Sequence, residues 1–119
     1  MEVQIFGLKK SADTRKALRF FAERRIRTHF VDLAERSISE GELQRFVQRF
    51  GVEALVDHES KRYAELGLRH ANVSNARWIE RLIAEPALLV LPLVRRIGQP
   101  SDVTVGLADA TWKPPHHGV

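Results

Sequence analysis

IFGLKKSADTRKA, at residues 5–17, predicts a strand that passes through a tight loop into a helix. Residues 3–6 form a short apolar run, which favours a buried strand, and a glycine follows them. Ser11 is a preferred N-cap residue, and the helix it starts is expected to end near Arg24. The carboxylate of Asp13 suits the first turn of that helix because it faces the positive end of the helix dipole. The apolar face of this helix is expected to contain Thr14, Ala17, Leu18 and Phe21.

The next segments repeat the alternation of strand and helix. Residues 28–33 predict a second strand, and Ser39 with Glu42 has the spacing of a capping box for the helix that follows. Gly51 is a suitable stop for that helix. Its apolar stripe consists of Leu43, Phe46, Val47 and Phe50. The order strand, helix, strand, helix favours a parallel βαβ unit with a right-handed crossover.

The remainder predicts short helices and then a β-hairpin. The expected helices cover residues 52–56, residues 61–66 with Ser60 as N-cap and Gly67 as stop, and a segment from Ser74 or Asn75 to Pro86. Residues 88–96 are apolar and extended, with Pro92 interrupting them, and residues 103–105 form the return strand after a turn over residues 98–102. A last helical turn is expected over residues 108–113.

Composition limits the classes of function. The chain has 119 residues, which predicts a single domain over residues 1–113 and a flexible tail over residues 114–119. No apolar run reaches the roughly 18 residues of a membrane span, and the N-terminus does not resemble a signal peptide, so we expect a cytoplasmic protein with no membrane partner. Cysteine is absent, which excludes disulfides, thiolate metal sites and thiol catalysis.

Positive charge gathers near the first helix, although the net charge of the whole chain is only +4. The cations in this region are Lys9, Lys10, Arg15, Lys16, Arg19, Arg24, Arg25 and Arg27, opposed by Asp13 and Glu23. A solvated helix face is the simplest interpretation, and attraction of nucleic acid or of an acidic protein surface is the alternative. No aromatic residues alternate with the basic ones on that face, which argues against stacking of single-stranded bases.

Four local strings, in order along residues 3–113, resemble segments of the arsenate reductase-like (ArsC/Spx) family. Residues 7–11, GLKKS, resemble the family loop G-I-K-N-C, and residues 60–68, SKRYAELGL, resemble its Y-x-x-L-G-L segment. Residues 85–94, EPALLVLPLV, resemble N-P-x-L-I-x-R-P-I-V, and residues 105–113, VGLADATWK, resemble V-G-F-x-x-x-x-W-K. The resemblance implies an α/β fold: a thioredoxin-like mixed β-sheet flanked by helices, with a helical insertion over roughly residues 34–86.

The same resemblance implies that the positions responsible for chemistry have changed. Ser11 stands at the position of the nucleophilic cysteine, and Thr14 at that of the second cysteine of the redox-switch (Spx) branch. Asp57 stands where arsenate reductases carry an oxyanion-binding arginine. Leu91 and Leu107 also replace arginines, whereas Pro92 matches the proline that is cis in thioredoxin-like folds.

The function that we expect follows from a family scaffold that is retained although its nucleophilic cysteine is absent. We expect no catalytic residue, cofactor or metal, because serine cannot act as the leaving thiolate of thiol chemistry and no histidine lies near Ser11 in sequence. His116 and His117 lie in the tail and are not interpreted as a metal site. We expect a protein-binding or regulatory module, and the transcription machinery is the candidate partner by analogy with the redox-switch branch. Gly51 matches a family glycine that these regulators place at their contact with RNA polymerase, although a helix stop explains it equally well.

A ligand-binding or oxidoreductase-related role at the Ser11 loop is the alternative. Backbone N–H groups at a helix start attract anions, so phosphate or glutathione could bind there. The residues assigned to this degenerate anion site are Lys9, Lys10, Ser11, Thr14, Arg15 and Pro92. Arg95 and Arg96 either approach this loop or are hairpin charges.

Overall fold

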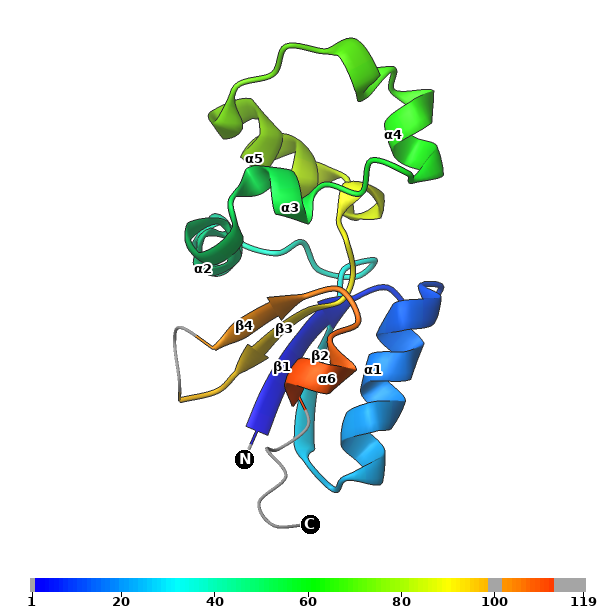
Figure 1. Cartoon of the computed structure of the whole chain (residues 1–119), viewed down its shortest axis with the longest axis vertical. Coiled ribbons are helices and arrows are strands. Elements are labelled where there is room, and N and C mark those ends of the chain that lie inside the picture. Colours follow the sequence, from blue (N-terminus) through cyan, green and yellow to red (C-terminus); the bar gives the residue numbers. More distant parts are fainter. Residues whose placement is uncertain (1, 99–101, 113–119) are drawn as a thin grey trace.

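The chain folds around a mixed sheet with the strand order β2-β1-β3-β4 (Figure 1). The computed structural model describes residues 2–98 and 102–112. The strands are β1 (Glu2–Gly7), β2 (Arg27–Asp32), β3 (Leu93–Arg96) and β4 (Val103–Val105). β1 pairs in parallel with β2, and β3 is antiparallel to both β1 and β4. The predicted α/β class and βαβ unit are therefore confirmed.

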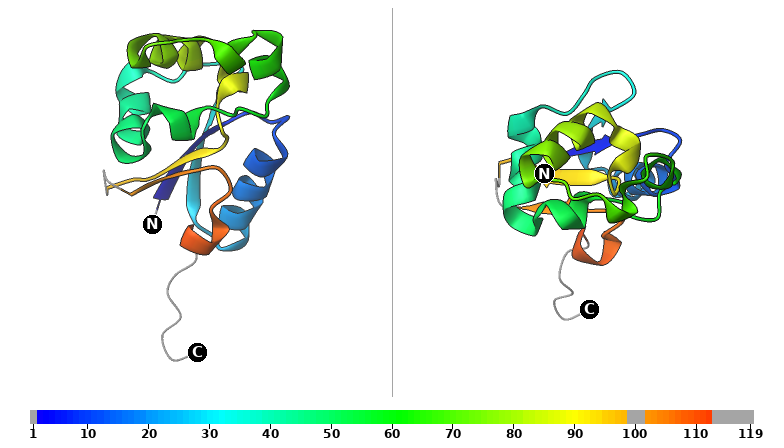
Figure 2. Two further views of the ribbon diagram at one scale, coloured as in Figure 1. Left: turned by 45° about the horizontal axis from the view of Figure 1, so that its top comes forward. Right: turned by 90° about the horizontal axis from the view of Figure 1, so that it is seen from above.

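Helices cover both faces of this sheet. One face, with Val3, Ile5 and Val94, packs against α1 (Ala12–Glu23) and α6 (Asp109–Trp112). The opposite face, with Phe6 and Leu93, packs against the helical insertion. The insertion contains α2 (Glu40–Phe50), α3 (Val52–Leu55), α4 (Lys61–Glu65), η1 (Leu68–His70), α5 (Asn75–Ala84) and η2 (Pro86–Leu88). Its helices gather near the carboxyl end of β1, whereas α6 lies toward the other end (Figures 1 and 2).

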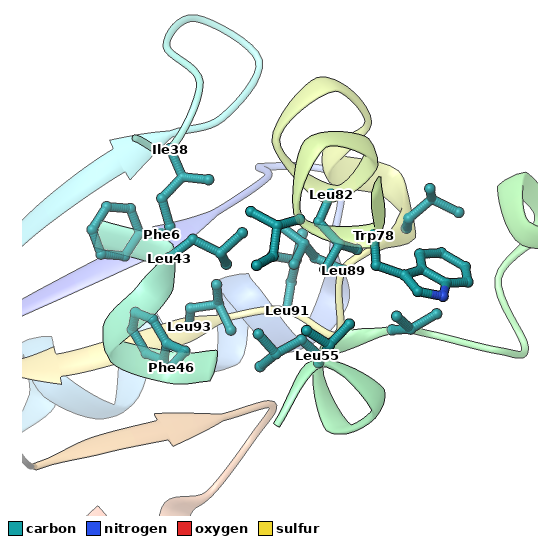
Figure 3. Close-up of a cluster of buried hydrophobic side chains, with 14 of the residues drawn as sticks. Phe6, Ile38, Leu43, Phe46, Leu55, Trp78, Leu82, Leu89, Leu91 and Leu93 are labelled. Carbon is teal, nitrogen blue, oxygen red and sulfur yellow. The ribbon is translucent and has the colours of Figure 1, made fainter. Parts of the chain in front are cut away.

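The larger core cluster joins the sheet to the insertion. Figure 3 shows Phe6 and Leu93 of the sheet beside Leu43 and Phe46 of α2. The rings of Phe6 and Phe46 meet edge to face, with centroids 6.1 Å apart and planes at 86°. Aromatic pairs favour this arrangement because the positive edge of one ring meets the negative face of the other. Of the stripe predicted for α2, Leu43 and Phe46 thus lie in the core and Val47 is partly buried, whereas Phe50, in the last turn, is 37% exposed and the prediction was wrong for it.

The helix starts follow the expected side-chain caps. The capping box of α2 is present: the Ser39 hydroxyl accepts from the Glu42 N–H at 3.1 Å, and the Glu42 carboxylate accepts from the Ser39 N–H at 2.9 Å. Three further serines accept from the N–H three residues later: Ser11, Ser60 and Ser74. Ser74, rather than Asn75, is the N-cap of α5. Gly51 ends α2 with a φ of 83°, a conformation that favours glycine.

The segment before β3 differs from the expected long extended run. Pro86–Leu88 forms the 3-10 turn η2, and β3 begins only at Leu93. Pro92 has no N–H to donate, so it cannot extend the strand ladder. The Leu91–Pro92 peptide bond is cis, as the family resemblance implies.

The buried face of α1 also differs by one residue. Phe20 is buried, with 8% of its surface exposed, whereas Leu18 is only partly buried. The Phe20 ring packs against both Phe21 and Trp112, at centroid distances of 5.2 and 5.4 Å. Contact with Trp112 of α6 therefore rotates the buried face toward Phe20.

The turn predicted over residues 98–102 lies partly outside the described residues, and the predicted tail, with His116 and His117, lies wholly outside them. In the part of the chain that the structure describes, no helix is long and apolar enough to cross a membrane.

Phe46→Ala should lower the free energy of unfolding by about 3–5 kcal/mol, because it removes a fully buried ring from the larger core cluster. Phe50→Ala is a matched control on the same helix, since Phe50 is 37% exposed, and it should lose well under half as much. Urea unfolding monitored by circular dichroism measures both. Equal losses for the two variants would contradict the described orientation of α2.

Candidate functional site

The loop between β1 and α1 places Ser11 at the carboxyl end of the central strand. The Ser11 N–H donates to the Leu8 carbonyl at 2.9 Å, which closes the turn. The Ser11 hydroxyl accepts from the Thr14 N–H at 3.2 Å, so its oxygen is engaged as the N-cap of α1. Ser11 therefore has the structural role that the sequence predicts for it.

An open groove of about 460 Å³ lies beside Ser11, and we call it the Ser11 groove. It is lined by Leu8, Lys10, Ser11, Ala12, Asp13, Asp57, Ala87, Leu89, Val90 and Leu91. The charged residues of this lining are one lysine and two aspartates. No histidine belongs to the lining, so none of the side chains around Ser11 is an imidazole base that could activate its hydroxyl.

Asp57 lies beside this groove because the backbone of residues 56 and 57 pairs with the segment before β3. Val56 and Leu89 form an antiparallel bridge, and the Asp57 N–H donates to the Leu88 carbonyl at 2.8 Å. The Asp57 carboxylate accepts from the Glu59 N–H at 3.1 Å. Asp57, at the position where the family resemblance implies an arginine, thus contributes a negative charge to the Ser11 groove.

A second open groove of about 440 Å³ lies on the other side of the same loop, and we call it the β2 groove. It is lined by Leu8, Lys9, Lys10, Asp32, Ala34, Glu85, Pro86 and Ala87. It lies at the carboxyl ends of the parallel strands β1 and β2, where α/β sheets commonly bind ligands. Leu8, Lys10 and Ala87 line both grooves, so the two form neighbouring parts of one surface.

Charges in the β2 groove are mostly paired. The Lys9 ammonium lies 3.8 Å from the Asp32 carboxylate. Arg62 donates to both carboxylate oxygens of Glu85, at 2.7 and 3.1 Å, and this hydrogen bonding lowers the pKa of Glu85. Within the described residues, Lys10 has no such carboxylate partner.

The six residues assigned to an anion site do not converge. Lys10 and Ser11 line the Ser11 groove, but Lys9 pairs with Asp32 in the β2 groove. The Arg15 guanidinium donates to the Lys9 carbonyl at 2.7 Å and lines neither groove.

Thr14 and Pro92, the remaining two, are fully buried supports of the loop. The Thr14 side chain lies against Gly7, where an added Cβ would stand 2.5 Å from the Thr14 methyl carbon. The Thr14 hydroxyl has no hydrogen-bond partner among the described residues. The Pro92 carbonyl accepts from the Gly106 N–H at 2.9 Å, which fixes the end of β4 against this segment.

Arg95 and Arg96 belong to β3 and do not line the Ser11 groove. The Arg95 guanidinium donates to the Gln4 side-chain oxygen at 2.9 and 3.1 Å, and Arg96 lies 3.1 Å from the Asp102 carboxylate. Of the two interpretations left open by the sequence, the structure favours hairpin charges.

The groove-lining role of Asp13 and Ala87 was not predicted from the sequence. Asp13 was explained by the helix dipole alone, and Ala87 gives no chemical signal. Among the described residues, no group of three or more histidine, aspartate or glutamate side chains is placed to hold a metal ion.

Comparison with known proteins supports the resemblance seen in the sequence. The model of the ArsC family matches residues 6–114. No curated protein matches the chain. An arsenate reductase from Vibrio cholerae is 26% identical, with a TM-score of 0.76 and coverage of 92% of both chains.

Two further solved structures show the same fold at lower identity. The YffB protein has a TM-score of 0.81 at 20% identity and covers 92% of this chain and 95% of its own. An ArsC-related protein from Brucella melitensis has a TM-score of 0.70 at 24% identity, covering 94% of this chain and 92% of its own. The expected thioredoxin-like fold is confirmed.

Gly7→Ala should lower the free energy of unfolding by about 1–3 kcal/mol, because the new methyl group overlaps the Thr14 side chain. Adding Thr14→Ala should recover part of this loss, since it removes the two closest atoms. Gly41→Ala is the matched control: nothing lies within 4 Å of its Cβ, so it should be neutral or stabilising. Strict additivity of Gly7→Ala and Thr14→Ala in denaturant unfolding would contradict this contact.

Proposed function

This chain belongs to the ArsC family, and we propose that it acts by binding a protein partner in the cytoplasm, without thiol or arsenate chemistry. The observation that carries the proposal is the Ser11 groove. It is an open site at the family loop, but its charged lining is Lys10, Asp13 and Asp57. The full sequence contains no cysteine.

The chemistry available in this groove argues against reduction of arsenate. That reaction needs a thiolate that attacks and later leaves, which a serine hydroxyl cannot replace. The Ser11 oxygen already accepts the Thr14 N–H, and no imidazole lines the groove. Two carboxylates would also repel an arsenate or phosphate dianion.

The shape of the surface supports a protein partner. The Ser11 and β2 grooves adjoin at Leu8, Lys10 and Ala87, and together they offer apolar side chains on both sides of one exposed lysine. Their apolar members are Leu8, Ala12, Ala34, Pro86, Ala87, Leu89, Val90 and Leu91. A surface that mixes apolar side chains with polar and charged ones suits an extended or helical segment of another protein.

The transcription machinery is the first class of partner to test, by analogy with the redox-switch branch of the family. Gly51, which matches the glycine at that contact, is exposed between α2 and α3. Gly51 lines neither groove, so this support is independent of them. The positive φ of Gly51 also explains this residue as a helix stop.

Anion binding at the Ser11 loop is the rival function. Neutralising the two aspartates of the Ser11 groove distinguishes it from protein binding. The unmodified protein should bind phosphate, arsenate and glutathione only weakly, with millimolar affinity at best, in titration calorimetry. The double variant Asp13→Asn/Asp57→Asn should bind phosphate about ten-fold more tightly than the unmodified protein, because two repelling charges are removed. Glu65→Gln/Glu80→Gln carries the same charge change outside the groove and should have no effect. Tight binding of any of these ligands to the unmodified protein would favour the rival function.

Ala87→Glu should abolish capture of the partner, because Ala87 lines both grooves and the substitution places a charge between them. Affinity purification from the native cytosol, with quantitative mass spectrometry, compares this variant with Ala76→Glu on the exposed side of α5. Circular dichroism checks that both variants fold. The proposal fails if no protein is captured reproducibly, or if Ala87→Glu and Ala76→Glu capture the same proteins equally.

A further inference from the structure

We propose that α1 carries a second docking surface, which binds an acidic segment of another protein through carboxylates and an apolar side chain. The surface is a groove of about 270 Å³ between α1 and the segment after β4, here called the α1 groove. It is lined by Lys16, Arg19, Phe20, Glu23, Arg24, Leu107 and Asp109. None of these residues lines the Ser11 or β2 groove, so this inference does not rest on the proposed function.

Arg24 is held in this groove by contacts that leave its charge uncompensated. Its guanidinium lies over the Phe20 ring, 3.6 Å from the centroid, and it donates to the Phe20 carbonyl at 3.1 Å. The ring and the carbonyl fix the side chain without supplying a negative charge. A bound carboxylate would therefore meet a cation whose conformational entropy is already partly lost.

The same kind of contact recurs along α1. Arg15 donates to the Lys9 carbonyl rather than to a carboxylate. Over residues 2–98 and 102–112, the following cations of α1 and of the two residues after it form no ion pair with a carboxylate: Arg15, Lys16, Arg19, Arg24 and Arg25.

Elsewhere among the described residues, five arginines pair with a carboxylate and five do not. The paired ones are Arg27, Arg36, Arg62, Arg77 and Arg96, and the others are Arg45, Arg49, Arg69, Arg81 and Arg95. Arg36 pairs with Glu42, and Arg62 pairs with Glu85, each through two hydrogen bonds. Arg96 lies 3.1 Å from the Asp102 carboxylate. Five cations without a carboxylate partner in the part of the chain that the structure describes nevertheless lie close together within residues 15–25, and this local density would attract an acidic partner.

An apolar residue of the α1 groove indicates that the partner also needs an apolar side chain. Leu107 is 37% exposed, which is high for a leucine, and it lines the groove together with Phe20. An apolar side chain between the carboxylates of the partner would cover Leu107 and gain the free energy of that burial. We therefore expect a segment that mixes acidic and apolar residues.

Nucleic acid fits this groove less well. Glu23 and Asp109 line it beside the cations, and they would repel a continuous row of phosphates. Phe20, which is only 8% exposed, presents no free face on which a base could stack. A protein segment can instead place its carboxylates opposite the cations alone.

Fluorescence anisotropy with three labelled probes tests this inference. The probes are a short peptide in which single leucines separate pairs of glutamates, an all-glutamate peptide of the same length, and a DNA duplex. The leucine–glutamate peptide should bind most tightly, and added salt should weaken its binding.

Variants locate the binding on α1. Arg19→Glu should weaken binding of the leucine–glutamate peptide about ten-fold. Lys61→Glu makes an equal charge change at an exposed position of α4 and should change this affinity less than about two-fold. Leu107→Asn should weaken the leucine–glutamate peptide but not the all-glutamate peptide. Three results would each overturn the inference: tighter binding of the DNA duplex, equal binding of the two peptides, or equal effects of Arg19→Glu and Lys61→Glu.

Discussion

Burial of β1 on both faces is the constraint on which the rest of this structure depends. Val3 and Ile5 pack toward α1 and α6, whereas Phe6 packs toward α2. A strand buried in this way needs a neighbour on each edge and a helix layer on each face. Both follow, since β2 and β3 pair with β1 while α1 and the insertion cover it. The chain must then leave the sheet at Gly7, where the close contact with Thr14 fixes the loop that forms the wall of both the Ser11 and β2 grooves.

Much of this fold could be predicted because its signals are local. Each N-cap serine and the stops at Gly51 and Gly67 act within one helical turn, so the sequence shows them directly. The prediction of the buried face of α1 was partly wrong because that face depends on a contact distant in sequence. Whether Phe20 or Leu18 is buried depends on Trp112, which lies about 90 residues away and packs on Phe20. The late start of β3 likewise depends on the η2 turn and on Pro92, which has no N–H for the strand ladder, and apolarity alone does not reveal the turn.

The candidate site was less predictable than the fold. Ser11 was correctly interpreted as an N-cap, because capping is local. The predicted grouping of Lys9 and Arg15 around it did not follow, because long cationic side chains turn toward partners that tertiary structure supplies. Lys9 finds Asp32 at the end of β2, and Arg15 finds a backbone carbonyl. Asp57 joins the groove only through the pairing of Val56 with Leu89.

The partner of each cation, rather than the number of cations, decides what each surface of this molecule can bind. An arginine paired with a carboxylate, such as Arg62 with Glu85, adds little net field. An arginine held by a carbonyl and a ring, such as Arg24, keeps its full charge in a fixed position. The net charge of +4 is therefore not spread evenly over the surface. At the family loop, Asp13 and Asp57 oppose Lys10, which makes an oxyanion a poor ligand, whereas the exposed side of α1 stays positive. A scaffold can thus exchange one class of ligand for another through side-chain charges while its backbone stays the same.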